Sequence, residues 1–304
     1  LGVLYAIFII GGAFGGGNMF QANQSYELVG SLTGIPNWIY GIVLMGLVAA
    51  VIMGGIERIG KTTEKIVPTM VVLYVAASLF IIVMNIDKLP GVISSIFSQA
   101  FTPSATYGGF MGVIIVGIKR AVFSNEGGVG SAAIAHSAAK TDEPVREGIV
   151  AMIGPFIDTI VVCTMSALVI LVTGIWNRPG ELIAEEVSFS QAPDSSSWVL
   201  STASKNVNDL QQGQRVYMIY EGELNPETGN NLNKIYGTTL TTNQNSVIEW
   251  ETINVAQAPV INNRSIYLDY VGATLTAAAF DKVLPGLGKW LVTLASWLFA
   301  ISTM

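Results

Sequence analysis

The residues best suited to bind a small solute interrupt an apolar stretch in the middle of the chain. Phe123-Ser124-Asn125-Glu126-Gly127-Gly128-Val129-Gly130-Ser131 lies between an apolar run at 108–118 and an alanine-rich run at 132–139. Glycines loosen a helix, and an unpaired backbone polar group is costly in hydrocarbon, so this stretch must line a cavity or pack against protein. Broken helices near the bilayer midplane bind solutes and coupling ions in secondary transporters. The stretch therefore indicates a solute site within a membrane.

Ionisable side chains lie close to this break, and each is expensive in a membrane unless it is paired or hydrated. Lys119 and Arg120 precede Glu126 by seven and six residues, so they can pair with it only if the chain folds back. Asp158 is another possible partner. We expect Lys119, Arg120 and Asp158 to form a structural ion-pair network and Glu126 to have a gating or structural part, with proton transfer as the alternative. His136 is expected to cap or face the interface rather than relay protons.

The composition places these residues in a polytopic α-helical membrane protein. Of the 304 residues, 51% are hydrophobic and 12% charged, with a mean hydropathy of +0.54, values typical of a chain embedded in lipid. About twenty apolar residues cross a bilayer. Six spans are predicted on this basis: 1–20, 38–55, 67–86, the broken span 108–139, 148–176 and 284–304.

The charges between the spans predict the orientation. The segments 56–66 and 136–147 carry basic residues, 21–37 carries none, and 87–107 carries only Lys88. By the positive-inside rule the first two are cytoplasmic loops. It follows that the segment 177–270 lies outside the cytoplasm.

That segment, 177–270, is expected to be a small β-rich extracytoplasmic domain. It holds eleven acidic and five basic residues, which account for the whole formal net charge of −6. Strands are predicted at 216–220, 234–242, 247–255 and 265–270, where β-branched and aromatic residues concentrate, with a turn-rich cluster at 225–231. A partly ordered loop is the alternative. The resulting domains are 1–176, 177–270 and a return segment with the sixth span at 271–304.

Several classes of protein are disfavoured by what the sequence contains. There is one cysteine, Cys163, so no disulfide can form within the chain. We find no paired nucleophile and base, no metal-ligand spacing, no phosphate loop and no nucleic-acid signature, so neither an enzyme nor an organic cofactor is expected. Leu1 and Met304 both fall within apolar runs, which predicts that this chain is a piece of a longer protein.

Longer motifs carry a resemblance to a known family. Three of them, 15–24 (GGGNMFQANQ), 123–141 (FSNEGGVGSAAIAHSAAKT) and 155–165 (PFIDTIVVCTM), resemble the alanine or glycine:cation symporter family, the sodium:alanine symporters. The resemblance spans residues 1–176 and resumes at 270–304. It implies the inverted-repeat fold of the leucine transporter, with core helices three to eight present. The first broken helix and the last core helices of that fold are missing, and the outer loop at 177–270 is enlarged.

The resemblance also implies site residues. A zwitterionic amino acid needs donors for its carboxylate and acceptors for its ammonium group, which half-helix ends supply. Gly16, Gln21, Phe123, Ser124 and Asn125 are assigned to the substrate on this basis. Close packing of small residues is the alternative for the neighbouring glycines Gly11, Gly12 and Gly15.

A coupling sodium ion requires a cage of oxygens. Ser302 and Thr303 match the hydroxyl pair that leucine-transporter relatives place on helix eight, and Thr303 is also placed at the substrate. The alternative is a hydroxyl that returns its hydrogen bond to a carbonyl of its own helix.

The resulting hypothesis is a secondary active transporter of the bacterial cytoplasmic (inner) membrane. Its partners are sodium, a small neutral amino acid (alanine or glycine) and the lipid bilayer, with no nucleic acid. Two competing hypotheses remain: proton-coupled amino-acid transport, and a membrane-anchored extracytoplasmic sensor or binding module.

Overall fold

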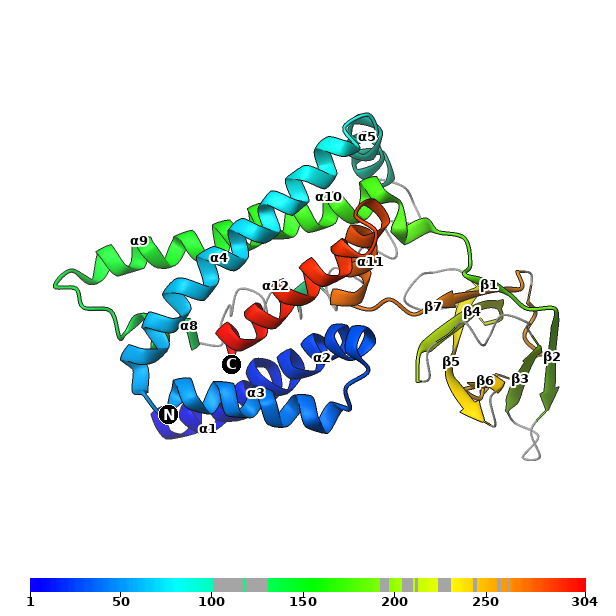
Figure 1. Ribbon diagram of the computed structural model, residues 1–304, viewed down its shortest axis with the longest axis horizontal. Helices are drawn as coiled ribbons and strands as arrows, with labels where there is room; N and C mark the ends of the chain where they lie inside the picture. Colours follow the sequence, from blue (N-terminus) through cyan, green and yellow to red (C-terminus); the bar gives the residue numbers. More distant parts are fainter. Residues whose placement is uncertain are drawn as a thin grey trace. The chain divides into compact units, whose positions relative to one another are not determined.

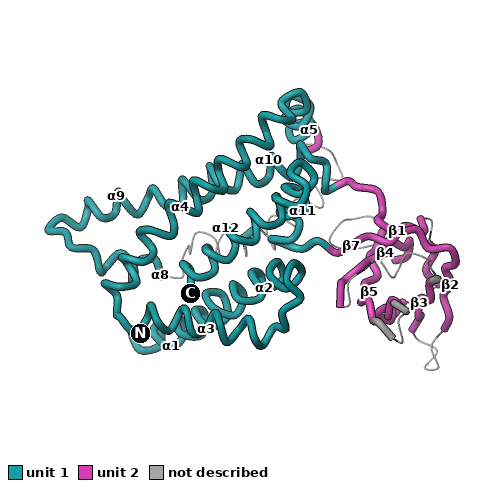
Figure 2. The backbone as a smooth tube through the Cα atoms, in the orientation of Figure 1, with its two compact units in different colours: residues 1–98, 113–176, 270–304 teal, residues 99–112, 177–269 magenta. Residues whose placement is uncertain are grey.

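The computed structural model describes most of the chain. The described residues are 1–100, 117–118, 131–191, 197–203, 210, 213–223, 231–242, 245–255, 258–261 and 263–304. They divide into two compact units, shown in Figure 2: a helical unit that includes Leu1–Ser98 and Tyr270–Met304, and a β-rich unit that includes Asn177–Asp269. The predicted break of the fourth span at 124–130 lies outside the described residues.

The helical unit is built from long apolar segments (Figure 1). Its helices are α1 (Gly2–Gly12), α2 (Phe20–Thr33), α3 (Asn37–Ile52), α4 (Gly55–Met84), α5 (Leu89–Ala100), α8 (Ser131–His136), α9 (Pro144–Pro155), α10 (Thr164–Thr173), α11 (Ala273–Val283) and α12 (Leu287–Thr303). The described residues also form three shorter helical segments: η1 (Ala13–Met19) and η3 (Phe156–Cys163) are π-helical, and η4 (Ile175–Asn177) is a 3-10 turn.

Three continuous helices are long and apolar enough to cross a membrane among the described residues. They are Gly2–Thr33, Gly55–Met84 and Pro144–Thr173, with shorter apolar helices at Asn37–Ile52 and Leu287–Thr303. Five of the six predicted spans thus correspond to apolar helices, and the remaining one, the fourth span at 108–139, is described only in part. The chain has the helices of a polytopic membrane protein.

Three predicted loops are wrong, because helix continues through them. α2 runs on to Thr33, α4 begins at Gly55, and α5 occupies Leu89–Ala100, where 21–37, 56–66 and 87–107 were predicted as loops. Glutamate, lysine and arginine are good helix formers. Hydroxyls in these segments also bond back to carbonyls one turn earlier, as Thr62 does to Arg58, so polar composition does not end the helix.

The core of the helical unit lies between α4, α10 and α11, with α12 packed against α4, α2 and α11. Three residues are completely buried there: Ile81 of α4, Val169 of α10 and Phe280 of α11. The α11–α12 turn is closed by Asp281, whose carboxylate accepts hydrogen bonds from the backbone N–H groups of Gly286 (2.8 Å) and Lys289 (3.4 Å) at the start of α12. These contacts fix α12 against the centre of the bundle.

Seven strands are formed by the described residues of the β-rich unit. They are β1 (Leu182–Ile183), β2 (Glu186–Gln191), β3 (Trp198–Ala203), β4 (Arg215–Glu221), β5 (Leu232–Thr242), β6 (Asn245–Trp250) and β7 (Ser265–Leu268). β1-β7-β4-β5-β6 form an antiparallel sheet, and β2 and β3 form a two-stranded sheet. The predicted strands at 216–220 and 234–242 are confirmed, and 247–255 and 265–270 are shorter than predicted. The turn cluster at 225–231 lies almost wholly outside the described residues.

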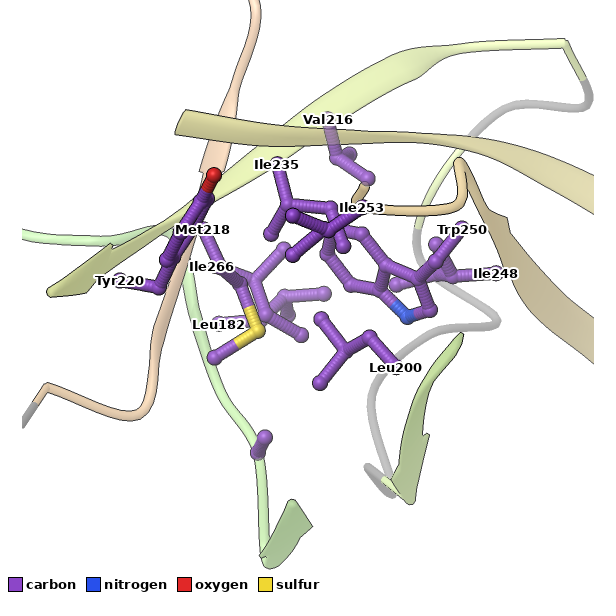
Figure 3. Packing of buried hydrophobic residues seen from close by; sticks show 11 residues of the cluster. Leu182, Leu200, Val216, Met218, Tyr220, Ile235, Ile248, Trp250, Ile253 and Ile266 are labelled. Atoms are coloured by element: carbon purple, nitrogen blue, oxygen red, sulfur yellow. The ribbon is translucent and has the colours of Figure 1, made fainter. Parts of the chain in front are cut away.

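The β-rich unit has a hydrophobic core of its own. Alternate residues of β4 point inward, so Val216, Met218 and Tyr220 are buried while their neighbours are not. They meet Ile235 of β5 and Trp250 of β6, as Figure 3 shows. The Trp250 ring N–H donates to the Thr202 hydroxyl at 3.0 Å, which ties the small sheet to the large one.

The two ends of this unit are held together. Leu182 pairs with Ile266 across β1 and β7. Arg178 forms an ion pair with Glu181 at 2.7 Å and donates to the Leu268 carbonyl at 2.5 Å, while the Glu181 carboxylate accepts the Leu268 N–H at 3.0 Å. Because entry and exit are adjacent, the unit can extend one loop of a helical bundle without spreading the flanking helices.

Candidate functional site

A π-helical interruption lies within the first apolar helix and carries Gly16. Ala13–Met19 is wound with one extra residue per turn between α1 and α2. The side-chain amide of Asn18 donates to the Ala13 carbonyl, five residues earlier, at 3.1 Å. Single π-helical turns inside α-helices are rare and frequent at functional sites. Three consecutive glycines, with no side chains to hold a regular helix, make this winding accessible.

The glycines on either side of Gly16 have no close packing partner among the described residues. A Cβ added at Gly11, Gly12, Gly15 or Gly17 would meet no described atom within 4 Å. The packing alternative for Gly11, Gly12 and Gly15 is therefore not supported within the described part of the chain.

Gln21 lies one turn beyond the π-helical segment, at the start of α2. Its side chain is half-buried, and among the described residues its amide has no hydrogen-bond partner. Its backbone carbonyl accepts from the Ser25 hydroxyl at 2.8 Å, and Ser25 in turn accepts from Tyr40 at 2.8 Å. The helix is thus anchored to α3 while the Gln21 amide, which can both donate and accept, stays available to a ligand.

An open apolar groove lies beside the π-helical segment. It has a volume of about 510 Å³, and Asn18, Met19 and Ala22 line one side, residues of α3 between Gly41 and Met53 another, and Met304 a third. Asn18 supplies an amide to a lining whose other described residues are apolar. The predicted residues Gly16, Gln21, Ser302 and Thr303 do not line this groove, so it does not bring them together.

Ser302 and Thr303 return their hydrogen bonds to their own helix. Both hydroxyls donate to the Phe299 carbonyl, at 2.8 and 2.9 Å. This is the geometry of the back-bonding alternative. Each oxygen keeps its lone pairs, so the arrangement remains compatible with cation binding.

The remaining predicted residues are only partly described. Phe123, Ser124, Asn125, Lys119, Arg120 and Glu126 lie outside the described residues. Asp158 lies half-buried in the second π-helical segment, η3, and takes part in an interaction. The ion-pair network of Lys119, Arg120 and Asp158 stays a prediction.

His136 forms a local contact between helices. Its Nδ1 lies 2.6 Å from Oε1 of Glu147, which links the end of α8 to the first turn of α9. Whether His136 caps a helix or faces the membrane interface stays a prediction. Sequence reasoning missed a different polar contact, between Tyr74 of α4 and Ser166 of α10. Their only sequence signal is the presence of hydroxyls in apolar spans.

Comparison with known proteins places the chain in a transporter family. The family model described as the sodium:alanine symporter family matches residues 1–200. The chain is 50% identical over 181 residues to the sodium/alanine symporter AgcS of Methanococcus maripaludis, covering 59% of this chain and 40% of that protein. It is 35% identical over 184 residues to the probable sodium/glutamine symporter GlnT of Bacillus subtilis, covering 59% and 38%.

The chain thus spans about two fifths of the length of these relatives. The family match ends at residue 200, so the resemblance at 270–304 stays a prediction. The matched part contains the π-helical segment with Gly16, the Gln21 amide and the η3 segment with Asp158. This chain belongs to the sodium:alanine symporter family, a family of membrane transporters rather than enzymes.

Proposed function

We propose that the full-length protein is a sodium-coupled symporter that carries a small neutral amino acid, alanine or glycine, by alternating access. The proposal includes the inverted-repeat, leucine-transporter-like fold, with this chain supplying core helices three to eight. Membership of the family supports the coupled transport, and the relatives include a sodium/alanine symporter and a probable sodium/glutamine symporter. The substrate of this chain is therefore part of the proposal.

The observation that carries the proposal is the interruption at Ala13–Met19, beside which the Gln21 amide has no hydrogen-bond partner among the described residues. A polar side chain in a membrane helix is costly unless a partner satisfies it. An amino-acid carboxylate or ammonium group is such a partner, because an amide can donate to the first and accept from the second. Phe123, Ser124 and Asn125 are proposed to complete the substrate site.

Sodium is proposed to bind at Ser302 and Thr303, with Thr303 also near the substrate. The two hydroxyl protons point to the Phe299 carbonyl, which leaves oxygen lone pairs as ligands. Sodium needs more oxygens than two hydroxyls provide. The remaining ligands are proposed to come from the first broken helix of the full-length protein.

The protein is proposed to lie in the cytoplasmic membrane, with Asn177–Asp269 outside the cytoplasm. The basic residues of 56–66 and 136–147 support this orientation. The β-rich unit is proposed to be an accessory domain without a part in transport. The proposal is supported by its own hydrophobic core and by the pairing of its first and last strands, which let it fold as a separate unit.

Uptake by the purified full-length protein in lipid vesicles tests the proposal. Radiolabelled alanine should accumulate with an inward sodium gradient and not when choline replaces sodium. Gln21→Ala should lower kcat/KM by on the order of tenfold or more, since a hydrogen bond to a charged group contributes about 1.5–3 kcal/mol. Asn23→Ala is the matched control, because Asn23 is an exposed amide on the same helix. Equal loss in both variants would argue against a ligand role for Gln21.

Two further experiments address the competing hypotheses. Glu126→Gln should leave sodium-driven uptake and its pH dependence largely intact, whereas proton coupling through Glu126 predicts that the pH dependence disappears. Deletion of 181–266, bridged by a short glycine linker, should leave transport in place. A short linker can bridge the deletion, because its two ends are adjacent: a Cβ added at Gly180 would lie 3.1 Å from the Ile266 carbonyl oxygen. Complete loss of transport in a folded deletion variant would favour the hypothesis in which the β-rich unit is the working part.

A further inference from the structure

A short amphipathic helix, α5, follows the long apolar helix α4 (Figure 1). Residues 66–84 of α4 carry no charged side chain, and the nearest charged residues on either side are Lys65 and Asp87. At 1.5 Å per residue this stretch is about 28 Å long, close to the roughly 30 Å of hydrocarbon in a bilayer. Met84, the last residue of α4, therefore lies near the boundary between hydrocarbon and headgroups.

The turn between the two helices is short and internally bonded. α4 ends at Met84, and α5 begins at Leu89. Within the turn the Lys88 backbone N–H donates to the Asn85 carbonyl at 3.0 Å, and the Lys88 ammonium group donates to the Asn85 side-chain oxygen at 2.9 Å. Because the turn is this short, α5 starts at the level where α4 leaves the hydrocarbon.

One face of α5 is apolar, and the opposite face is polar without being charged. Residues three and four positions apart lie on the same face of a helix. The bulky apolar residues follow this spacing: Leu89, Val92, Ile93, Ile96 and Phe97. The opposite face holds Ser94, Ser95, Ser98 and Gln99. The helix contains no lysine, arginine, aspartate or glutamate, so its two faces differ in polarity alone.

The apolar face of α5 is not covered by the described part of the chain. No residue of α5 is buried there, and Ile93, Ile96 and Phe97 are 44%, 44% and 67% exposed. Leaving such side chains in water is unfavourable, so an apolar environment must cover them. The helix has 12 residues and is about 18 Å long, too short to cross a bilayer. It must therefore find that environment without spanning the membrane.

We propose that α5 lies along the membrane surface and binds the lipid bilayer through its apolar face, with Ile93, Ile96 and Phe97 in contact with acyl chains. Amphipathic helices bind membrane interfaces in this way. Lipid is the apolar environment at this level, because the last two turns of α4 expose apolar side chains among the described residues: Leu79, Phe80, Val83 and Met84. The contact holds the end of α4 at the membrane surface.

The missing charge specifies the kind of lipid contact. Segments that are attracted to anionic lipids carry several lysines or arginines. The polar face of α5 has hydroxyl groups and one amide instead, and these can form hydrogen bonds with headgroups of any charge. Burial of the apolar face alone must therefore hold the helix on the bilayer, so the contact should not require anionic lipid.

Spin labels on the two faces of α5 test this in the full-length protein in phosphatidylcholine vesicles. Single labels are placed at Ile93→Cys or Phe97→Cys on the apolar face and at Ser94→Cys or Ser98→Cys on the polar face, with Cys163→Ala and any other cysteine of the full-length protein also replaced. Labels on the apolar face should collide more often with oxygen, which dissolves in hydrocarbon, than with a water-soluble nickel chelate. Labels on the polar face should show the reverse order. Adding phosphatidylglycerol should leave both orders unchanged.

The inference is overturned if labels at Ile93 and Phe97 are immobile and reached by neither reagent, because protein then covers the apolar face. A short distance between the labels of two copies would identify that protein as a second copy of this chain. Equal access of the chelate to all four positions would place the helix in water, and a preference for oxygen at all four would place it inside the hydrocarbon; both results also overturn it. An order that appears only with phosphatidylglycerol would reject a contact made without charge. None of these outcomes depends on uptake, so they are independent of whether transport is coupled to sodium.

Discussion

Substituting Gly288 by alanine should loosen the contact between α11 and α12. Gly288 lies in the first turn of α12, where a Cβ would be 2.4 Å from both the Asp281 nitrogen and the Phe280 carbonyl carbon, and 2.5 Å from the Phe280 carbonyl oxygen. All three are backbone atoms, so no side chain can rotate away. Ordinary contact begins near 3.4 Å, so the two helices must separate by about 1 Å locally.

The cost of this separation has two sources. Overpacking a well-packed site typically costs about 1–3 kcal/mol. The separation also weakens the hydrogen bonds by which Asp281 caps the start of α12, and losing a cap costs about 0.5–2 kcal/mol. Together they predict a loss of roughly 1.5–5 kcal/mol. At about 2–4 °C per kcal/mol for a chain of this size, Tm should fall by roughly 3–20 °C.

Thermal unfolding of the detergent-solubilised protein, followed by tryptophan fluorescence, measures this effect. Gly60→Ala is the matched control, since Gly60 lies inside α4 with no atom within 4 Å of an added Cβ, and alanine is the better helix former. It should leave Tm unchanged or raise it slightly. A Gly288→Ala variant as stable as the wild type would refute the described approach of α12 to α11.

Three further substitutions test other parts of the account. Gly272→Ala should lower Tm for two reasons: Gly272 has φ +59°, and an added Cβ would lie 2.4 Å from Oε1 of Gln24. Adding Gln24→Ala removes the side-chain clash but not the backbone strain, so it should restore only part of the lost Tm. Met218→Ala should lower the free energy of unfolding of the β-rich unit by about 2–5 kcal/mol. It should increase hydrogen exchange in β4 and β5 and leave exchange in α4 unchanged, whereas exchange would increase in both if the two units unfolded together. Burial raises the pKa of Asp269, against the opposing effect of Arg215. The contribution of Asp269 to stability is thus fully present below the unfolded pKa of about 3.9 and is lost as pH rises through the folded pKa. Asp269→Asn should therefore slow hydrogen exchange of β7 at neutral pH and match the wild type in acid. Faster exchange in the variant at neutral pH would contradict the raised pKa of Asp269.

The sequence predicted best the elements whose pattern records burial. The strands at 216–220 and 234–242 agree closely with β4 and β5, because inward and outward residues alternate along them. β2 was missed although Val187 and Phe189 alternate with Glu186, Ser188 and Ser190 and pack against the core of the unit. Its apolar face has only these two residues, so the composition of the segment is mostly polar, and pairing with β3 completes the strand.

Helix boundaries in the membrane part were predicted less well, because hydropathy marks the lipid-contacting length of a helix and not its ends. α4 continues through charged residues to Gly55, and α2 through amides and hydroxyls to Thr33. The π-helical segments η1 and η3 have no hydropathy signal. The assignment of Gly16 and Gln21 to the substrate, made from the resemblance, stays a prediction, and the structure adds that a π-helical turn contains Gly16 and precedes Gln21.

Reciprocal flux is the most direct test of coupled symport. Vesicles containing the full-length protein are equilibrated with radioactive sodium at equal concentration on both sides, and unlabelled alanine is then added outside. If the two solutes move together, the alanine gradient must draw sodium inward above its equilibrium level, and Gln21→Ala should reduce this flux while Asn23→Ala does not. Alanine entry without any net movement of sodium would contradict the account.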